Sequence, residues 1–124
     1  MTTCAQPWPG RCASDPFLYL TTTGRPHRIE IWFAAHDRQL YLMSGGRDRA
    51  DWVRNLLANP RVSVELGGET HQGLARVLAP ETAEDQVARD LLVAKYGDHE
   101  DLDEWGRTSL PVAIEFRAKQ FTGA

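Results

Sequence analysis

Six stretches of the chain carry the hydrophobic patterns of β-strands. In three of them apolar and polar positions alternate with the two-residue period of a strand that buries one face. Two others are short runs of apolar or β-branched residues bounded by turn residues, and the remaining one is predicted from the glycine pair that joins it to the strand before it. The predicted strands cover residues 17–23, 28–33, 39–43, 61–66, 70–78 and 112–117.

Turn residues join these strands in pairs. Gly24 and Pro26 mark a turn after the first strand, and residues 36–38 form a short turn before the third. The first three predicted strands therefore form a meander. The glycine pair at 67–68 supplies the positive φ angles of a tight hairpin between the fourth and fifth strands. Pro111 begins the last strand, a position at which proline loses no ladder hydrogen bond.

The first of two helical patterns follows the third strand. Asp48 is its predicted N-cap, and Pro60 stops the helix because it pushes Asn59 out of the α region. The apolar residues of this helix fall on one face at helical spacing. They are Trp52, Val53, Leu56 and Leu57.

The second helical pattern follows the fifth strand. Pro80 and Glu81 open it, and Gly97 is the predicted left-handed stop. Its apolar stripe consists of Ala83, Val87, Leu91 and Ala94. The acidic stretch 98–104 that comes next lacks the alternating ligands and central glycine of a calcium loop, so we predict a solvated segment.

The order of these elements predicts the fold class. Strands do not alternate with crossover helices, which argues against a doubly wound parallel sheet. About six mostly antiparallel strands with two inserted helices fit a mainly β protein, a small closed or partly open barrel in which closure removes exposed edges. We expect one domain over residues 16–124, preceded by a loose N-terminal segment, 1–15, in which Trp8 can fold back over an apolar surface.

Composition narrows the function classes. The chain has 124 residues, 42% of them hydrophobic, and a formal net charge of −3 without any block of basic residues. These values argue against nucleic acid or an anionic membrane as the main partner. No run approaches the roughly 18 apolar residues of a membrane span, so we expect a cytoplasmic protein. Cys4 and Cys12 are expected to be reduced thiols, and no zinc-site spacing occurs, so no metal is predicted.

Catalytic motifs built from the protein alone are weak in this chain. Ser44 lies in a glycine-rich turn but lacks the Gly-x-Ser-x-Gly elbow of serine hydrolases. His71 and His99 are isolated, and the paired carboxylates lie on polar faces, which is typical of solvated side chains. The phosphate interpretation of residues 44–49 is stronger than any of these candidates.

The strongest chemical signal is the turn between the third strand and the first helix. Gly45 and Gly46 offer backbone N–H groups, and Arg47 and Arg49 add guanidinium groups, a combination that suits a phosphate. The run Thr21–Arg25 ends the first strand with further donors. On the second strand a polar face beside a large aromatic side chain would suit a flat polar ring. That face carries Arg28, Glu30 and Trp32.

These motifs together resemble the deazaflavin-dependent nitroreductase family of the split β-barrel superfamily, which is related to pyridoxamine 5′-phosphate oxidase. The resemblance covers roughly residues 17–116. It is carried by Thr-Thr-Thr-Gly-Arg at 21–25, Ser-Gly-Gly at 44–46, Trp52-x-x-Asn55-Leu56-x-x-Asn59-Pro60 and Val62-x-Val64-x-x-Gly67-Gly68.

The resemblance implies a split barrel of the FMN-binding type that binds the deazaflavin coenzyme F420. The expected activity is that of an F420H2-dependent reductase, with hydride passing to a quinone, a nitroaromatic or another electron-poor small molecule. FMN is the alternative cofactor, and a deazaflavin carrier without turnover is the alternative function. Relatives commonly form two-fold dimers, which leaves a homodimer open.

The resemblance also assigns site residues. The phosphate turn would comprise Ser44, Gly45, Gly46, Arg47 and Arg49; Arg25 and His27 match the basic segment after the threonines; Trp52 and Asn55 match the helix beside the cofactor groove. The ring would lie beside strands that hold Arg28, Glu30, Trp32 and Met43. Asn55 and Asn59 also fit a structural role, which we prefer for Asn59.

Three departures from the family pattern affect the acceptor side of the site. The chain passes directly from Gly24 to Arg25-Pro26 where many members carry a longer loop, and the loop after Ser44 is shorter than in the nitroimidazole-reducing members. Of the family's pocket tyrosines, Tyr96 matches one, while His99 and Leu102 stand where others would be. We expect substrate near Trp32, Tyr96 and Trp105, with Tyr96, His99 or solvent as the proton donor.

Overall fold

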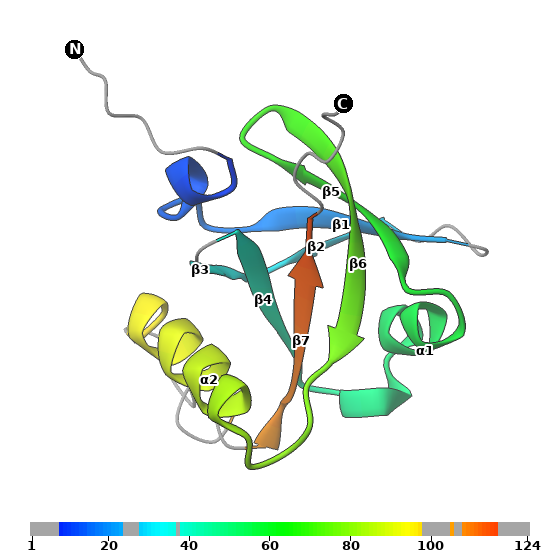
Figure 1. Ribbon diagram of the computed structural model, residues 1–124, viewed down its shortest axis with the longest axis vertical. Helices are drawn as coiled ribbons and strands as arrows, with labels where there is room; N and C mark the ends of the chain where they lie inside the picture. The colour runs from blue at the N-terminus through cyan, green and yellow to red at the C-terminus, as the bar shows by residue number, and fades with distance from the viewer. Residues whose placement is uncertain (1–7, 24–27, 37, 98–104, 106–107, 117–124) are drawn as a thin grey trace.

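The computed structural model describes residues 8–23, 28–36, 38–97, 105 and 108–116 (Figure 1). Within these residues the chain forms seven strands, two α-helices and two single-turn 3-10 helices. The strands are β1 Leu18–Thr22, β2 Arg28–Ile31, β3 Ala34–His36, β4 Gln39–Ser44, β5 Arg61–Leu66, β6 Glu69–Val77 and β7 Leu110–Glu115. The helices are α1 Asp51–Ala58 and α2 Ala83–Lys95, with 3-10 turns η1 Gly10–Cys12 and η2 Arg47–Arg49.

The seven strands form one antiparallel sheet in the order β2-β1-β5-β6-β7-β4-β3. The sheet curls around a hydrophobic interior, with α1 near one end of the barrel and α2 against the outside of β4 and β7 (Figure 1). The predicted mainly β, mostly antiparallel barrel with two inserted helices is confirmed. The number of strands is seven where the sequence predicted six.

The additional strand arises because the predicted strand over residues 28–33 is interrupted. β2 pairs with β1, whereas β3 pairs with β4 at the other end of the strand order, so the predicted meander is wrong. The chain passes between them at Trp32 and Phe33. The backbone N–H of Phe33 donates to the Tyr96 hydroxyl, at 3.2 Å. Because only two residues separate β2 from β3, the two ends of the sheet are brought together.

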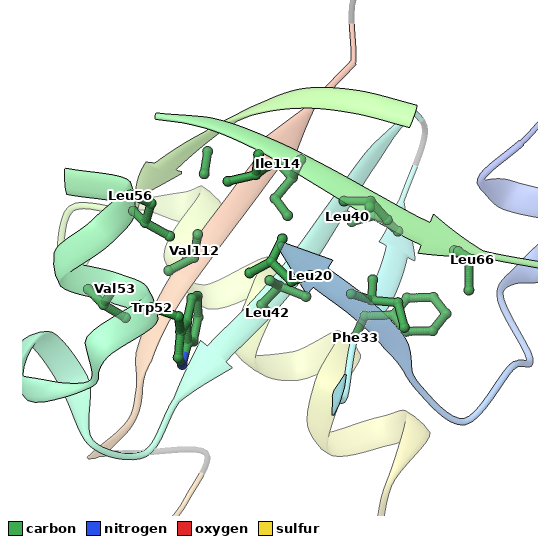
Figure 2. Packing of buried hydrophobic residues seen from close by; sticks show 14 of the residues in the cluster. Leu20, Phe33, Leu40, Leu42, Trp52, Val53, Leu56, Leu66, Val112 and Ile114 are labelled. Carbon is green, nitrogen blue, oxygen red and sulfur yellow. The ribbon is translucent and has the colours of Figure 1, made fainter. Parts of the chain in front are cut away.

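The interior of the barrel holds the main core. Phe33, Leu20, Leu42 and Ile114 are fully buried there, and Figure 2 shows the side chains of α1 reaching toward Leu42 and Val112. From α1, the buried residues are Trp52, Val53 and Leu56.

The start of α1 differs from the prediction. Asp48 is not its N-cap, because the chain first makes the turn η2 and the helix begins after Ala50. Leu57, predicted on the apolar face, is 59% exposed, since a helix of two turns closes the barrel end with its other apolar residues. The predicted end is confirmed: Asn59 is extended, with φ −149° and ψ 110°.

A second apolar cluster lies between α2 and the outside of the sheet. The buried face of α2 carries Ala88, Leu92 and Asp85, whereas Val87 is 37% exposed, so the predicted stripe is wrong by about one residue. Asp85 can be buried because Arg89 pairs with its carboxylate at 3.2 Å. The helix begins at Ala83 after Thr82, whose hydroxyl caps the N–H of Asp85.

Two further differences concern the conformation of Gly97, after α2, and the burial pattern of β7. Gly97 does not adopt the left-handed conformation predicted for it after α2. β7 is buried on both faces over Val112, Ala113 and Ile114, because the barrel interior covers one face and α2 the other. The alternation predicted for that strand therefore does not appear in its burial.

The described part of the N-terminal segment packs on the barrel. The indole N–H of Trp8 donates to Leu66 O at 3.0 Å, its ring stacks on His71 at 3.8 Å, and Cys12 is a buried free thiol in the main core. The sequence predicted a loose segment over 1–15, whereas the structure shows residues 8–15 in contact with the sheet. No helix among the described residues is long and apolar enough to cross a membrane.

The β5–β6 hairpin turns on Gly67 and Gly68, with φ 64° and 84°, as predicted. An alanine at either position is expected to lower the free energy of unfolding by about 1–2 kcal/mol, because both residues are left-handed. Gly67→Ala is expected to cost a further 1–3 kcal/mol or so, because its Cβ would collide with the buried Cys12 Sγ, while nothing lies within 4 Å at Gly68. Urea unfolding of the two variants measures the difference.

The collision is isolated by repeating both substitutions in a Cys12→Ala background. The thiol is then absent, so the additional loss at Gly67 should shrink while the loss at Gly68 stays constant. Equal losses for the two glycines in the parent protein would show that Cys12 does not restrict this turn.

Candidate functional site

The turn that follows β4 is held together by a hydrogen bond between its own residues. Ser44, the last residue of β4, is buried, and its hydroxyl donates to Arg47 O at 2.9 Å. Arg47 adopts φ 55°, an uncommon conformation for a residue other than glycine, and η2 follows directly. The Arg47 guanidinium donates to Thr108 O, and Arg49 is exposed. The structure thus keeps two guanidinium-bearing residues on one short turn, as predicted.

A second segment of the chain faces this turn. A Cβ built on Gly45 would lie 3.7 Å from Trp105 Cδ1 and 4.0 Å from Ser109 Oγ. The backbone N–H of Ser109 donates to Trp105 O at 3.0 Å, which holds the two residues together. Ser109 could not be singled out from the sequence, because a serine before a strand is common and only the fold places this one opposite Gly45.

An aromatic wall adjoins the turn, consisting of Trp32, Tyr96 and Trp105. The rings of Trp32 and Tyr96 stack with centroids 4.2 Å apart and planes 4° from parallel. Trp105 meets Trp32 edge-on at 5.7 Å and 76°. The three residues that the sequence predicted near the substrate are therefore in contact, and through Trp105 the wall is continuous with Gly45. A flat conjugated ring can stack on such a surface.

The Tyr96 hydroxyl is buried against backbone. It donates to Pro16 O at 2.7 Å, and it lies 3.2 Å from both the N–H and the O of Phe33. Burial raises the pKa of Tyr96, while its hydrogen bond to the Phe33 backbone opposes the rise. The described hydrogen bonds of this hydroxyl thus hold the backbone of Pro16 and of Phe33 next to the aromatic wall.

Lys95 is a residue of this region that the sequence analysis missed. Its ammonium group donates to Phe33 O at 3.0 Å and lies 3.6 Å above the centre of the Phe33 ring. Burial lowers the pKa of Lys95 to about 8, although the charge of Asp15 acts in the opposite direction. A basic residue in the last turn of a helix is a common pattern, so the sequence alone could not single it out.

Other predicted site residues lie away from the wall. Arg28 makes two 3.1 Å hydrogen bonds to the Glu65 carboxylate and lies 4.0 Å above the Tyr19 ring. The hydrogen bonds from Arg28 lower the pKa of Glu65. Glu30 is exposed on the same strand. At roughly 3.3 Å per strand residue, Arg28 lies about 13 Å along the chain from Trp32.

Three predicted site residues have structural contacts. Trp52 is part of the main core, and Met43 lies in the cluster beneath α2. The Asn55 amide donates to Thr22 Oγ1 at 3.0 Å, joining α1 to β1. The preferred structural role of Asn59 agrees with its geometry, since its side-chain oxygen accepts from the N–H of Arg61 at 3.1 Å. Arg25, His27, His99 and Leu102 lie outside the described residues.

The lowered pKa of Lys95 predicts a pH dependence of stability. The lysine loses its proton near pH 8 in the folded protein and near pH 10.5 in the unfolded chain, so the unfolded chain binds more protons between these values. The contribution of this group to stability therefore rises with pH in that window. These two pKa values correspond to a gain of about 2 kcal/mol for the wild type over Lys95→Met from pH 7 to 9.5, and screening by solvent at this half-buried site reduces it to about 1 kcal/mol. Urea unfolding at each pH measures the gain.

Comparison at the same pH removes the contributions of other groups that titrate in this range. Burial raises the pKa of both Cys12 and Tyr96, so both lower stability at high pH, and both remain in the variant. Parallel stability curves for the wild type and Lys95→Met would contradict a desolvated ammonium group at this position.

Solved structures of known proteins share this fold. HutZ, the heme storage protein from Vibrio cholerae, superposes with a TM-score of 0.68 at 18% identity, covering 82% of each chain. An F420-H2 dependent reductase (FDR-A) superposes with a TM-score of 0.65 at 24% identity, covering 81% of this chain and 93% of that one. A domain-swapped dimer matches with a TM-score of 0.64 at 24% identity, covering 81% and 79%. These likenesses confirm the predicted split β-barrel.

Sequence comparison identifies the family. None of the curated proteins compared with this chain matches it significantly. Residues 5–117, however, match the family model of the F420H(2)-dependent quinone reductases. That match spans nearly the whole chain and includes the turn after β4 as well as the aromatic wall. The chain therefore belongs to the F420H(2)-dependent quinone reductase family, and it is an oxidoreductase whose cofactor is F420.

Proposed function

We propose that this protein reduces a flat, electron-poor small molecule, a quinone or a nitroaromatic, with hydride from F420H2. The observation that carries the proposal is that Trp105, which meets Trp32 and through it Tyr96, also lies beside the open space at Gly45. Trp105 thereby joins a turn bearing two arginines to a surface of stacked aromatic rings. F420 likewise joins a phosphate to a flat ring, so both of its ends find suitable chemistry along one path.

Two observations support a fit between these residues and the cofactor. Gly45 leaves space that a Cβ would fill between the turn and Trp105, and the buried Ser109 hydroxyl beside it lacks a hydrogen-bond partner among the described residues. Both features favour a polar ligand at this turn. Arg47 and Arg49 would hold its phosphate by charge-assisted hydrogen bonds.

The aromatic wall would orient the acceptor. When bound, the reduced deazaflavin supplies the hydride, so the protein has to bind and position the two partners. Trp32 and Trp105 are half-buried and present ring surface on which a flat acceptor can stack. Stacking also keeps water from that side of the site, and positioning of this kind accounts for much of the rate enhancement in two-substrate reactions.

The proton donor stays a prediction, with Tyr96, His99 and solvent as the candidates. The hydrogen bonds of Tyr96 to Pro16 and Phe33 explain its position without any role in proton transfer. FMN as the cofactor and a carrier without turnover are not needed to explain a chain that belongs to a family of F420-dependent reductases. A cytoplasmic location likewise stays a prediction.

A homodimer is part of the proposal. One structural neighbour is a domain-swapped dimer, and two-fold dimers are the commonest oligomers. Light scattering coupled to gel filtration tests this assignment directly.

Acceptor-dependent oxidation of F420H2 tests the proposed activity. The purified protein is expected to accelerate the loss of reduced-cofactor absorbance with members of a panel of quinones and nitroaromatics, and to do so less with non-planar acceptors of similar potential. Trp32→Ala should lower kcat/KM for planar acceptors by about two- to tenfold, since aromatic stacking contributes about 0.5–1.5 kcal/mol beyond burial. Tight F420 binding without turnover across the whole panel would refute the proposed acceptor class.

The two arginines of the turn are tested by the double substitution Arg47→Ala/Arg49→Ala. It is expected to weaken F420 binding by more than tenfold, because hydrogen bonds to charged groups contribute about 1.5–3 kcal/mol each. Tryptophan quenching measures the affinity. The matched control, Arg38→Ala/Arg61→Ala, removes the same charge from exposed positions outside the turn and should change the affinity little. If both double variants bind equally well, the phosphate lies elsewhere.

A further inference from the structure

Ser109 carries a buried hydroxyl without a hydrogen-bond partner. The residue is 0% exposed, and its Oγ is the one buried side-chain polar atom among the described residues that lacks a partner. Buried hydroxyls are normally hydrogen-bonded, because they lose their bonds to water on folding. An unpaired one therefore needs an explanation at this particular position.

The hydroxyl lies against the turn assigned to the phosphate. Ser109 Oγ would be 4.0 Å from a Cβ on Gly45, and Trp105 Cδ1 would be 3.7 Å from the same point. The Arg47 guanidinium donates to the neighbouring Thr108 O. Ser109 is therefore adjacent to both the glycine and an arginine of that turn, although it lies 62 or more positions away in the sequence.

A second serine in the same turn provides the contrast. Ser44 is also buried, at 3% exposed, but its hydroxyl donates to Arg47 O at 2.9 Å and is satisfied within the protein. The local backbone can thus bond a buried serine hydroxyl, and it does so for Ser44. The Ser109 hydroxyl, in contrast, has no partner, and it lies beside Gly45, which has no side chain.

We propose that Ser109 is a ligand-binding residue, whose hydroxyl donates a hydrogen bond to an anionic oxygen of the group held at Gly45–Arg47. This inference rests on the proposed function, in which that group is the phosphate of F420. A serine hydroxyl donates one bond, and its bond to a charged oxygen is short and strong. Because Ser109 is fully buried, a side chain has to move before a ligand can reach it. The half-buried indole of Trp105 lies next to Gly45, on the side from which the ligand would approach.

The test is the effect of Ser109→Ala on two separate quantities. The stability of the ligand-free protein should stay the same or rise, because the substitution removes an unpaired polar atom from the interior. The affinity for F420 should fall by about tenfold or more. Urea unfolding measures the first quantity and titration calorimetry the second. Opposite directions in these two measurements distinguish a ligand-binding serine from a structural one.

Two further variants sharpen the test. Ser44→Ala, the matched control, should lower the stability of the free protein, because it removes a hydrogen bond made within the turn. Gly45→Ala should fold, since its Cβ makes only ordinary contacts, but it fills the space between the turn and Ser109. We expect it to weaken F420 binding by tenfold or more while the Ser109 hydroxyl is still present.

Each result decides the matter. If Ser109→Ala lowers the stability of the free protein, the hydroxyl is bonded there and the inference is wrong. If the variant is as stable as the wild type and binds F420 equally well, Ser109 faces a buried water, and the inference fails while the proposed function stands. If the wild type itself does not bind F420, the inference and the proposed function both fail.

Discussion

The backbone of Phe33 is the point on which the rest of the structure depends. Its N–H donates to the Tyr96 hydroxyl, and its carbonyl oxygen accepts from the Lys95 ammonium. Phe33 is fully buried and occupies the crossing between β2 and β3, where no ladder partner continues the strand. The helix end that carries Lys95 and Tyr96 replaces that partner, which allows the two ends of the sheet to meet without leaving buried backbone groups unbonded.

The same arrangement positions the proposed functional surface. The residue before Phe33 is Trp32, so fixing the Phe33 backbone also fixes the Trp32 ring against Tyr96. Trp105 then extends the wall to Gly45, and the Arg47 guanidinium bonds to Thr108 on the same side. The contacts that close the barrel therefore also position the side chains of the proposed site. A substitution that weakens the hydrogen bonds at Phe33 is therefore expected to change the position of the turn as well, because these side chains connect the two.

Local patterns in the sequence predicted most of the fold but not its closure. The β5–β6 hairpin and the end of α1 depend on adjacent residues, namely two glycines and a proline, and they formed as predicted. The break at Phe33 could not be predicted, because the two-residue period continues through it and its cause is a tyrosine 63 positions later. The buried face of α2 was missed for a similar reason, since Asp85 is buried only because Arg89 pairs with it.

The proposed site could be predicted from the sequence only in the parts that contain a recognisable motif. The Ser-Gly-Gly turn and the Trp-x-x-Asn-Leu run led to the correct family and cofactor. Contacts made across the fold were not accessible: Arg28, predicted beside the ring, pairs with Glu65, and Asn55 bonds Thr22. The type of side chain at a strand position indicates which groups it can bind. Whether it binds a ligand or another residue depends on which side chains the fold places next to it.

The distribution of unfavourable features points to the same side of the barrel. The left-handed Arg47, the unpaired Ser109 hydroxyl and the desolvated Lys95 all lie around the aromatic wall, whereas a second left-handed residue, Glu81 with φ 65°, lies in the turn before α2. Every other buried side-chain nitrogen or oxygen of the described residues has a hydrogen-bond partner. The exposed Arg76 also bonds Glu84, Glu115 and Gln39 at once. Folding stability alone would favour removing strain and unpaired groups, and such features persist where a function requires them. The unpaired hydroxyl of Ser109 and the strained backbone of Arg47 beside Gly45 therefore support the proposed site independently of the sequence motifs.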